Sequence, residues 1–206
     1  MIAAANQSHA SPNCTFRLQD CTTISDDLPE ETRKGKFDKV FSNAALHWIL
    51  RPASTRSAVL ASAFAALKPG GSFVFEMGAA GNVAEAHAAL IAALVHFGAS
   101  VEETEEASPW FFPSEPWMHS ALEEAGFVVE GLETEYRPTR LNEGEGGGLE
   151  GWMRLMGASF LERLDMEQRD EAVSWAVRML KTVCQREDGS EWLGYVRLRG
   201  VARRPL

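Results

Sequence analysis

Two short apolar runs separated by one helical stretch form the clearest pattern in the chain. Phe37–Ser42 and Ser72–Met77 are rich in Phe and Val, which is typical of buried strands. Between them, residues 54–67 place apolar side chains at helical spacing, with Ser54 as a candidate N-cap. Gly70-Gly71 then supplies the backbone freedom that ends the helix and turns the chain into the second strand. The pattern predicts one right-handed crossover of a parallel sheet.

Strands and helices also alternate along the rest of the chain. Further helices are predicted at residues 1–10, 82–97, 114–125, 149–164 and 167–186, and further strands at residues 14–18, 127–136 and 191–202. Residues 99–113 are acidic and then aromatic, and their prolines predict a loop. The order predicts a single α/β domain over residues 1–206, with a mostly parallel sheet, an antiparallel C-terminal strand and helices on both faces. A helical insertion at about 149–187 is expected before the last strand.

Composition and charge argue against several classes of partner. The formal net charge is −9, from 20 basic and 29 acidic residues, whereas nucleic-acid binding requires clustered Lys and Arg. No apolar run approaches the roughly 18 residues that span a bilayer, and the first residues do not resemble a secretory signal. The 3 cysteines lack a Cys-x-x-Cys spacing, and the histidines lack ligand spacing, so neither a disulfide scaffold nor a metal site is expected. We therefore expect a cytoplasmic protein with a small-molecule substrate, and neither nucleic acid nor membrane as a partner.

Polar residues follow two of the predicted strands at the point where each strand ends. Asp20 and Cys21 come shortly after the strand at 14–18. Ser42 and Asn43 end the strand that begins at Phe37. Because open α/β sheets bind ligands beyond the carboxyl ends of their strands, we expect these residues to border a ligand site.

The same region carries a resemblance to a known family. Phe-Asp-Lys-Val-Phe-Ser-Asn-Ala-Ala-Leu-His-Trp at residues 37–48, followed by Leu-Lys-Pro-Gly-Gly at residues 67–71, resembles the trans-aconitate methyltransferase group of class I S-adenosylmethionine (SAM)-dependent methyltransferases. The similarity extends to Gly148–Trp152 and the terminal strand. It implies a Rossmann-like methyltransferase sheet, SAM as the cofactor, and methyl transfer to a small molecule that is expected to bear a carboxylate.

The resemblance assigns one group of residues to the cofactor. Asp20 would accept a hydrogen bond from the adenine amino group, and Cys21 would face the adenine ring. Ser42, Asn43 and Ala44 would line the methionine end. The structural alternative for Asp20 is that it only caps or solvates a strand end.

A second group is assigned to the reacting methyl group and the substrate. His47 and Trp48 would face both, and His47 is the one candidate for a catalytic role. Trp110, Phe111 and Trp152 are candidates for substrate contacts. Each of them has a structural alternative, since aromatic side chains also pack in cores and His47 could be a packing histidine.

The resemblance implies a reaction that depends on positioning. Methyl transfer from a sulfonium is an in-line displacement, so the protein mainly aligns the reactants and excludes water. A carboxylate has an unperturbed pKa of about 4 and is already ionised near pH 7, so little general base catalysis is expected. The candidate cations for holding it are Arg137, Arg140, Arg154 and Arg178. The tail arginines, Arg197, Arg199, Arg203 and Arg204, are expected to be solvated.

One part of the family pattern is absent from residues 1–36, which contain no strand followed by a Gly-x-Gly loop. We therefore expect a chain truncated at its N-terminus, with the strand at 37–42 exposed at the edge of the sheet. Either the strand at 14–18 pairs with that edge, or a dimer or a partner chain covers it. The alternative function is a non-catalytic fragment or pseudoenzyme that lacks the SAM glycine loop and acts through a partner chain. A gene-model error would give the same sequence.

Overall fold

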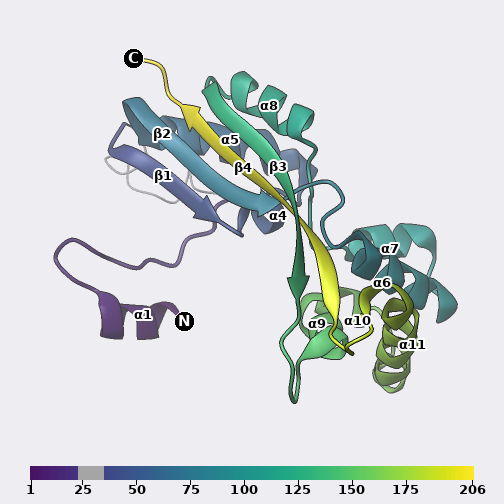
Figure 1. Cartoon of the computed structure of the whole chain (residues 1–206). Helices are drawn as coiled ribbons and strands as arrows, with labels where there is room; N and C mark the ends of the chain where they lie inside the picture. Colours follow the sequence, from purple (N-terminus) through teal and green to yellow (C-terminus); the bar gives the residue numbers. More distant parts are fainter. Residues whose placement is uncertain (23–34) are drawn as a thin grey trace.

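A four-stranded sheet in the order β1-β2-β4-β3 forms the centre of the molecule (Figure 1). The computed structural model describes residues 1–22 and 35–206. The strands are β1 (Phe37–Asn43), β2 (Leu67–Gly78), β3 (Val128–Arg140) and β4 (Trp192–Arg203). β1 pairs parallel with β2, while β4 runs antiparallel to both β2 and β3. The predicted α/β sheet is confirmed: three strands point one way, and the last strand points the other way.

The crossover from β1 to β2 contains three short elements. They are α4 (Leu46–Ile49), the 3-10 helix η1 (Ala53–Thr55) and α5 (Arg56–Ala66). We predicted that Ser54 caps this helix, but Ser54 lies within η1, and the N-cap of α5 is Thr55. β2 begins directly after α5, so Gly70-Gly71 lies inside the strand, beside a register shift against β1. Gly71 has no room for a side chain, since a Cβ there would lie 2.9 Å from the Lys68 carbonyl oxygen.

Three helices pack on one face of the sheet: α4, α5 and α8 (Glu115–Glu124). Leu60 of α5 and Met118 of α8 are buried against Phe73 and Phe75 of β2. We expected helices on both faces: these three helices share one face, and the second cluster described below packs against Leu193 and Tyr195 of β4, which alternate to the other face. On the opposite face, the Phe41 side chain is 73% exposed. That face also holds a shallow depression of about 580 Å³, lined in part by Phe41, Val74 and Val201.

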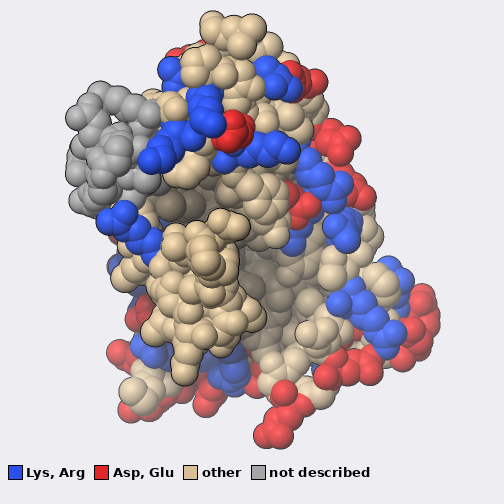
Figure 2. All heavy atoms as spheres, turned by 90° about the vertical axis from the view of Figure 1, so that its left-hand side faces the viewer, with Lys and Arg blue, Asp and Glu red and all other residues tan. Residues whose placement is uncertain are grey.

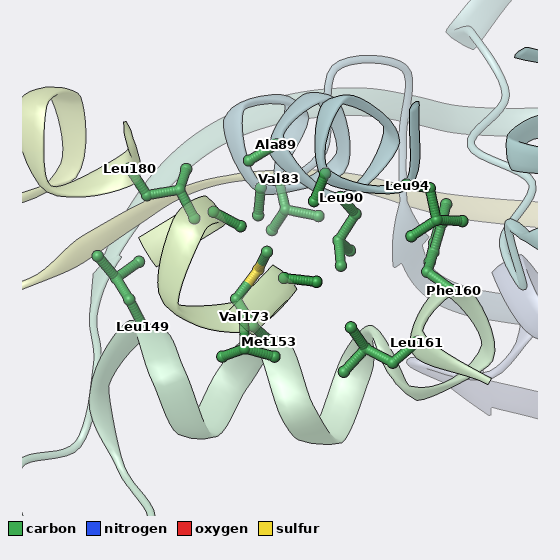
Figure 3. Close-up of a cluster of buried hydrophobic side chains, with 14 of the residues drawn as sticks. Val83, Ala89, Leu90, Leu94, Leu149, Met153, Phe160, Leu161, Val173 and Leu180 are labelled. Atoms are coloured by element: carbon green, nitrogen blue, oxygen red, sulfur yellow. The ribbon is translucent and has the colours of Figure 1, made fainter. Parts of the chain in front are cut away.

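A second cluster of helices packs on the half of the β3–β4 pair that extends beyond β2 (Figure 1). It consists of α6 (Ala84–His96), α7 (Val101–Ala107), α9 (Gly148–Met156), α10 (Ala158–Leu161) and α11 (Met166–Cys184). Figure 3 shows side chains from α6, such as Leu90 and Leu94, pointing toward Met153, Phe160 and Val173 of the other helices. Each buried side chain of this size contributes roughly 1.5–3 kcal/mol relative to exposure.

α7 lies within residues 99–113, where we predicted a loop. It begins with a capping box: the Ser100 side chain accepts a hydrogen bond from the Glu103 N–H, and the Glu103 side chain accepts one from the Ser100 N–H. These two bonds satisfy donors at the helix start that would otherwise lack partners. The aromatic half of the segment, from Trp110 to Pro113, has no regular structure, as predicted.

Residues 14–18 form no strand, contrary to the prediction. One isolated bridge joins Ser11 to Cys14. The Asn6 side-chain amide donates a hydrogen bond to the Phe16 carbonyl and accepts one from the Phe16 N–H. α1 (Ile2–His9) lies away from the sheet and buries none of its residues (Figure 1). A strand needs a neighbour for its backbone groups, and within the described residues β1 pairs with β2 alone. β1 is therefore an edge strand in this part of the chain.

Across residues 1–22 and 35–206, no helix combines the length and apolar character needed to cross a membrane.

Candidate functional site

A cavity of about 170 Å³ lies where the sheet meets the second helix cluster, and we call it the junction cavity. Its wall combines residues from the β1–α4 bend, the start of α6, the loop before α8, helix α9 and strand β4. These are Ala44, His47, Trp48, Asn82, Val83, Trp110, Phe112, Trp152, Met156, Tyr195 and Arg197. Residues from distant parts of the sequence thus meet at one place in the fold.

Backbone strain is concentrated at this cavity. In the described part of the chain, the non-glycine residues with positive φ are Ala44 (φ 52°) and Val83 (φ 47°), and both line the cavity. The left-handed conformation costs an L-residue roughly 1–2 kcal/mol. Hydrogen bonds hold both positions: the Ala44 N–H donates to the Glu76 carbonyl at 2.9 Å, and the Val83 N–H donates to the Gly194 carbonyl at 2.8 Å. Because such strain clusters at functional sites, it marks the junction cavity independently of any resemblance.

His47 is buried at the base of this cavity and carries no charge near pH 7. Its Nδ1 accepts a hydrogen bond from the Gly78 N–H at 3.2 Å. Burial, together with the nearby Arg197 charge, lowers the pKa of His47 to about 4. With Nδ1 accepting, the proton of the neutral ring is on Nε2, so the side chain offers one N–H donor. This arrangement is suited to orienting a ligand rather than to removing a proton.

Gly78 must remain a glycine for His47 to keep this partner. A Cβ at position 78 would lie 2.6 Å from Phe112 Cε1 and 2.8 Å from Asn82 Nδ2. Both of those side chains line the junction cavity. The close approach of the β2 backbone therefore fixes two walls of the cavity at once.

Aromatic rings form most of the wall. Trp110 stacks on Phe112, with ring centroids 5.7 Å apart, and meets Trp48 edge-on at 5.8 Å. Trp152 lies 6.2 Å from Trp110, and its Nε1 donates to the Tyr195 hydroxyl at 2.8 Å. The structure therefore brings together three of the predicted substrate residues, Trp48, Trp110 and Trp152.

Phe111, the fourth predicted substrate residue, lies outside the junction cavity. The Arg56 guanidinium sits 3.4 Å from the centroid of its ring, and Trp117 packs against it edge-on. Phe112 lines the cavity instead. Neighbouring side chains of an extended segment point to opposite sides. A prediction that chose Phe111 instead of Phe112 therefore chose the side chain that points away from the cavity.

Arg197 is the cation in the cavity wall, and sequence reasoning placed it among solvated tail residues. Its side chain is 21% exposed, and its Nε lies 4.0 Å from Glu76 Oε1. Glu76 Oε2 is closer to a different cation, Arg199 Nε, at 2.9 Å. The signal for Arg197 was its position two residues after Tyr195 on a predicted strand, which places both side chains on one face.

The arginines that we considered for holding a carboxylate lie away from the cavity. Arg140 pairs with Glu143, and Arg154 pairs with Glu150 and Asp170. Arg137 and Arg178 are exposed.

A second, larger hollow of about 560 Å³ runs beside β1, and we call it the edge hollow. β1, α4, α5 and residues 17–21 contribute to its wall. Figure 2 shows this side of the molecule, where uncharged surface borders a hollow and Lys and Arg side chains gather above it. Asn43 and Ala45 line the edge hollow, whereas Ala44 lines the junction cavity. At the strained bend around Ala44, consecutive residues therefore line the two different spaces.

Three of the predicted cofactor residues, Cys21, Ser42 and Asn43, line the edge hollow. Asp20 does not, and its Oδ1 accepts hydrogen bonds from the Thr22 N–H at 2.8 Å and the Thr22 hydroxyl at 2.7 Å. These bonds lower the pKa of Asp20. Asp20 thus neighbours the hollow in sequence without forming its wall.

The edge hollow has the size and one polar feature that a nucleoside cofactor requires. Small-molecule sites typically measure about 300–1,000 Å³. Within the described residues, the Ser42 Oγ is buried and has no hydrogen-bond partner. An unpaired buried hydroxyl costs roughly 1–3 kcal/mol, which a polar ligand would recover. On these grounds, the residues present fit SAM.

Comparisons with known proteins agree with the fold. Residues 1–75 match the family described as a methyltransferase domain. The chain is 40% identical over 178 residues to the uncharacterized methyltransferase C70.08c of Schizosaccharomyces pombe, which covers 86% of this chain and 65% of that protein. The chain thus spans slightly less than two thirds of this relative's length.

Solved structures with low sequence identity share the same architecture. The YcgJ protein of Bacillus subtilis superposes with a TM-score of 0.59 at 12% identity, over 99% of this chain and 76% of that one. A SAM-dependent methyltransferase of Methanosarcina mazei gives a TM-score of 0.52 at 13% identity, over 100% and 77%. These likenesses show the fold, and the match of residues 1–75 to a methyltransferase domain supports SAM as the cofactor.

Proposed function

We propose that this chain, which has the fold of class I SAM-dependent methyltransferases, takes part in methyl transfer from SAM to a small carboxylate-bearing molecule. The observation that carries the proposal is the bend at Ala44. It adjoins two hollows, one large enough for a nucleoside cofactor and one lined by aromatic rings and a cation. A displacement needs its two reactants on either side of the transferred group, and such a bend provides two adjoining compartments.

The edge hollow is the proposed place for the cofactor, with Cys21, Ser42 and Asn43 in contact and Ala44 beside the reacting end. When bound, SAM supplies an electrophilic methyl group on a sulfonium. Ser42 contributes a hydroxyl that lacks a partner in the described structure. A role for Asp20 on the adenine is compatible with its bonds to Thr22, because both of them fall on Oδ1 and a carboxylate has about four acceptor sites.

The junction cavity is the proposed place for the acceptor. Arg197 supplies positive charge for a carboxylate, and the neutral His47 ring supplies an N–H donor. A carboxylate with a pKa of about 4 is already ionised at pH 7, so no residue has to remove a proton. Trp48, Trp110 and Trp152 exclude water and limit the orientations of the acceptor. Positioning of this kind is worth roughly 7–11 kcal/mol.

A second candidate function is that of a non-catalytic chain that acts through a partner. It is supported by the exposed side chains along β1, where Phe41 is 73% exposed and Phe37 is 41% exposed. An edge strand with apolar side chains readily pairs with another chain. The two candidates differ in whether this chain alone holds the cofactor.

Calorimetric titration with S-adenosylhomocysteine separates them. Micromolar binding by this chain alone supports the enzyme, whereas no binding at millimolar concentration supports the non-catalytic chain. In the first case, Ser42→Ala is expected to weaken binding about fivefold, because a hydrogen bond contributes about 1 kcal/mol and 1.4 kcal/mol equals a factor of ten. Ser174→Ala, at an exposed position on α11, is the matched control and should bind as the wild type does. Equal affinities for Ser42→Ala and the control would contradict the assignment of the edge hollow.

A further inference from the structure

The charges around the junction cavity favour an anion over a cation. Arg197 lines the cavity, and no Asp or Glu among the described residues does so. Aromatic walls alone would also suit a quaternary ammonium group. The Arg197 charge opposes such a ligand, and no acidic side chain among the described residues of the cavity wall offsets that charge. The electrostatics therefore select acceptors with negative charge.

Arg197 has hydrogen-bonding capacity to spare for a ligand. Its contact with Glu76 is 4.0 Å long, at the limit of an ion pair, while Arg199 binds the other oxygen of Glu76 at 2.9 Å. Arg199, which also binds Glu135 at 2.6 Å, is thus the nearer cation to Glu76. A guanidinium can bind a carboxylate through two parallel N–H bonds, and at 21% exposure the Arg197 group is partly withdrawn from water.

The volume of the cavity limits the body of the acceptor. An apolar cavity of about 150 Å³ is sufficient to bind benzene, so a cavity of about 170 Å³ suits one ring or a short aliphatic chain. Trp48, Trp110, Phe112 and Trp152 present apolar surfaces to that body. A tricarboxylate would place additional charges against these rings without a cation for each, and burying an unpaired charge is costly.

We propose that the junction cavity selects a monocarboxylate with a ring-sized apolar or aromatic body, and that Arg197 binds its carboxylate. The inference rests on the proposed function for the identity of the site. It departs from the acceptor of the group that the sequence resembles, because trans-aconitate carries three carboxylates. Arg197 is the residue that determines specificity, and the tryptophans determine the shape of the body.

The test measures acceptor-side binding by calorimetry, with no need for turnover. The probes are benzoate, 3-phenylpropionate, benzamide, benzyltrimethylammonium and trans-aconitate, each titrated into the whole chain at pH 7.5. We expect the two aromatic monocarboxylates to bind about tenfold more tightly than benzamide and trans-aconitate, and the ammonium ion to bind most weakly. Tighter binding of trans-aconitate or of the ammonium ion would overturn the inference, and so would equal binding of benzoate and benzamide.

Variants connect the selectivity to Arg197. Arg197→Gln keeps part of the aliphatic stem and should lose about tenfold in benzoate affinity while benzamide affinity stays unchanged. Arg203→Gln, on the same strand but at the far end of the sheet, is the control and should leave both affinities unchanged. If Arg197→Gln fails to fold, Arg197→Lys keeps the charge but loses the two-bond geometry, and it should bind benzoate with an intermediate affinity. Wild-type benzoate affinity in whichever variant folds overturns the inference.

The outcomes for acceptor and cofactor can be distinguished. Benzoate binding that depends on Arg197, without S-adenosylhomocysteine binding, keeps the acceptor selectivity and contradicts the enzyme proposal for this chain. S-adenosylhomocysteine binding without selectivity for monocarboxylates supports the enzyme proposal and contradicts the acceptor selectivity.

Discussion

At the scale of single residues, the candidate site combines local features with one that only the fold supplies. Ser42 and Asn43 were predicted from their place at a strand end, and both line the edge hollow. The left-handed backbone at Ala44 has no sequence signal, since alanine does not favour that conformation. Arg197 was missed because nothing in the sequence shows that Arg199 is the closer partner of Glu76. Partner choice among neighbouring charges is a tertiary property.

The depressed pKa of His47 predicts a pH dependence of stability. Its pKa is about 4 in the folded chain, against 6.5 for an unperturbed histidine. Because the folded state binds the proton less well, the contribution of His47 is complete above about pH 6.5 and is lost as the pH falls toward 4. We expect the free energy of unfolding to fall by roughly 2 kcal/mol over this range from this group alone.

Urea denaturation at several pH values between 4 and 7 measures this contribution. His47→Gln should show a shallower dependence of unfolding free energy on pH than the wild type. His119→Gln is the control, because His119 lies on the surface beside Glu123. Identical slopes for the wild type and His47→Gln would show that His47 is not desolvated as described.

At the scale of helices and strands, the sequence predicted elements best where periodicity and end signals agree. β1, α6, α8 and β4 lie close to their predicted positions, and Ser114 caps α8. The strand at 14–18 was wrong, since alternation alone cannot supply the neighbour that a strand needs. α7 was missed because its acidic sequence lacks an apolar stripe, although Ser100-Val101-Glu102-Glu103 carries the capping-box signature.

The capping box of α7 gives a prediction for this element. Ser100→Ala removes the side-chain acceptor for the Glu103 N–H and should lower the free energy of unfolding by about 1 kcal/mol. Ser57→Ala, at an exposed position inside α5, tests a serine without a capping role. Chemical denaturation followed by circular dichroism compares the two variants. Equal stability of both would mean that the capping box contributes nothing measurable.

At the scale of the whole molecule, the region around β1 and β2 is covered by helices α4, α5 and α8 on one face and carries exposed apolar side chains on the other. Phe41 and Val201 are exposed there, beside the edge of β1 that pairs with no further strand in residues 1–22 and 35–206. Exposed apolar surface next to a free strand edge favours association between chains. The sequence predicted this edge through the family resemblance, and of the covers that it suggested, the strand at 14–18 does not form.

The whole-molecule prediction is that this chain self-associates as its concentration rises. Phe41→Lys should reduce the self-association by placing a charge on the open face, with no loss of stability because the side chain is already exposed. Analytical ultracentrifugation over a range of concentrations measures the effect. Met166→Lys, at another exposed apolar position on α11, is the control and should associate as the wild type does. A monomeric wild type at every concentration would contradict the prediction.

Helix α9, which carries Trp152, forms a part of the junction cavity wall that can change separately from the rest. Trp152 and Met156 come from α9, which the chain inserts between β3 and β4, and they form one side of the junction cavity. The other side includes Ala44, whose neighbours in sequence line the edge hollow. Under the proposed function, exchanging α9 would therefore alter which acceptors fit the junction cavity while leaving the edge hollow, the proposed cofactor compartment, intact. The side formed by α9 can therefore be redesigned more freely than the side that contains Ala44.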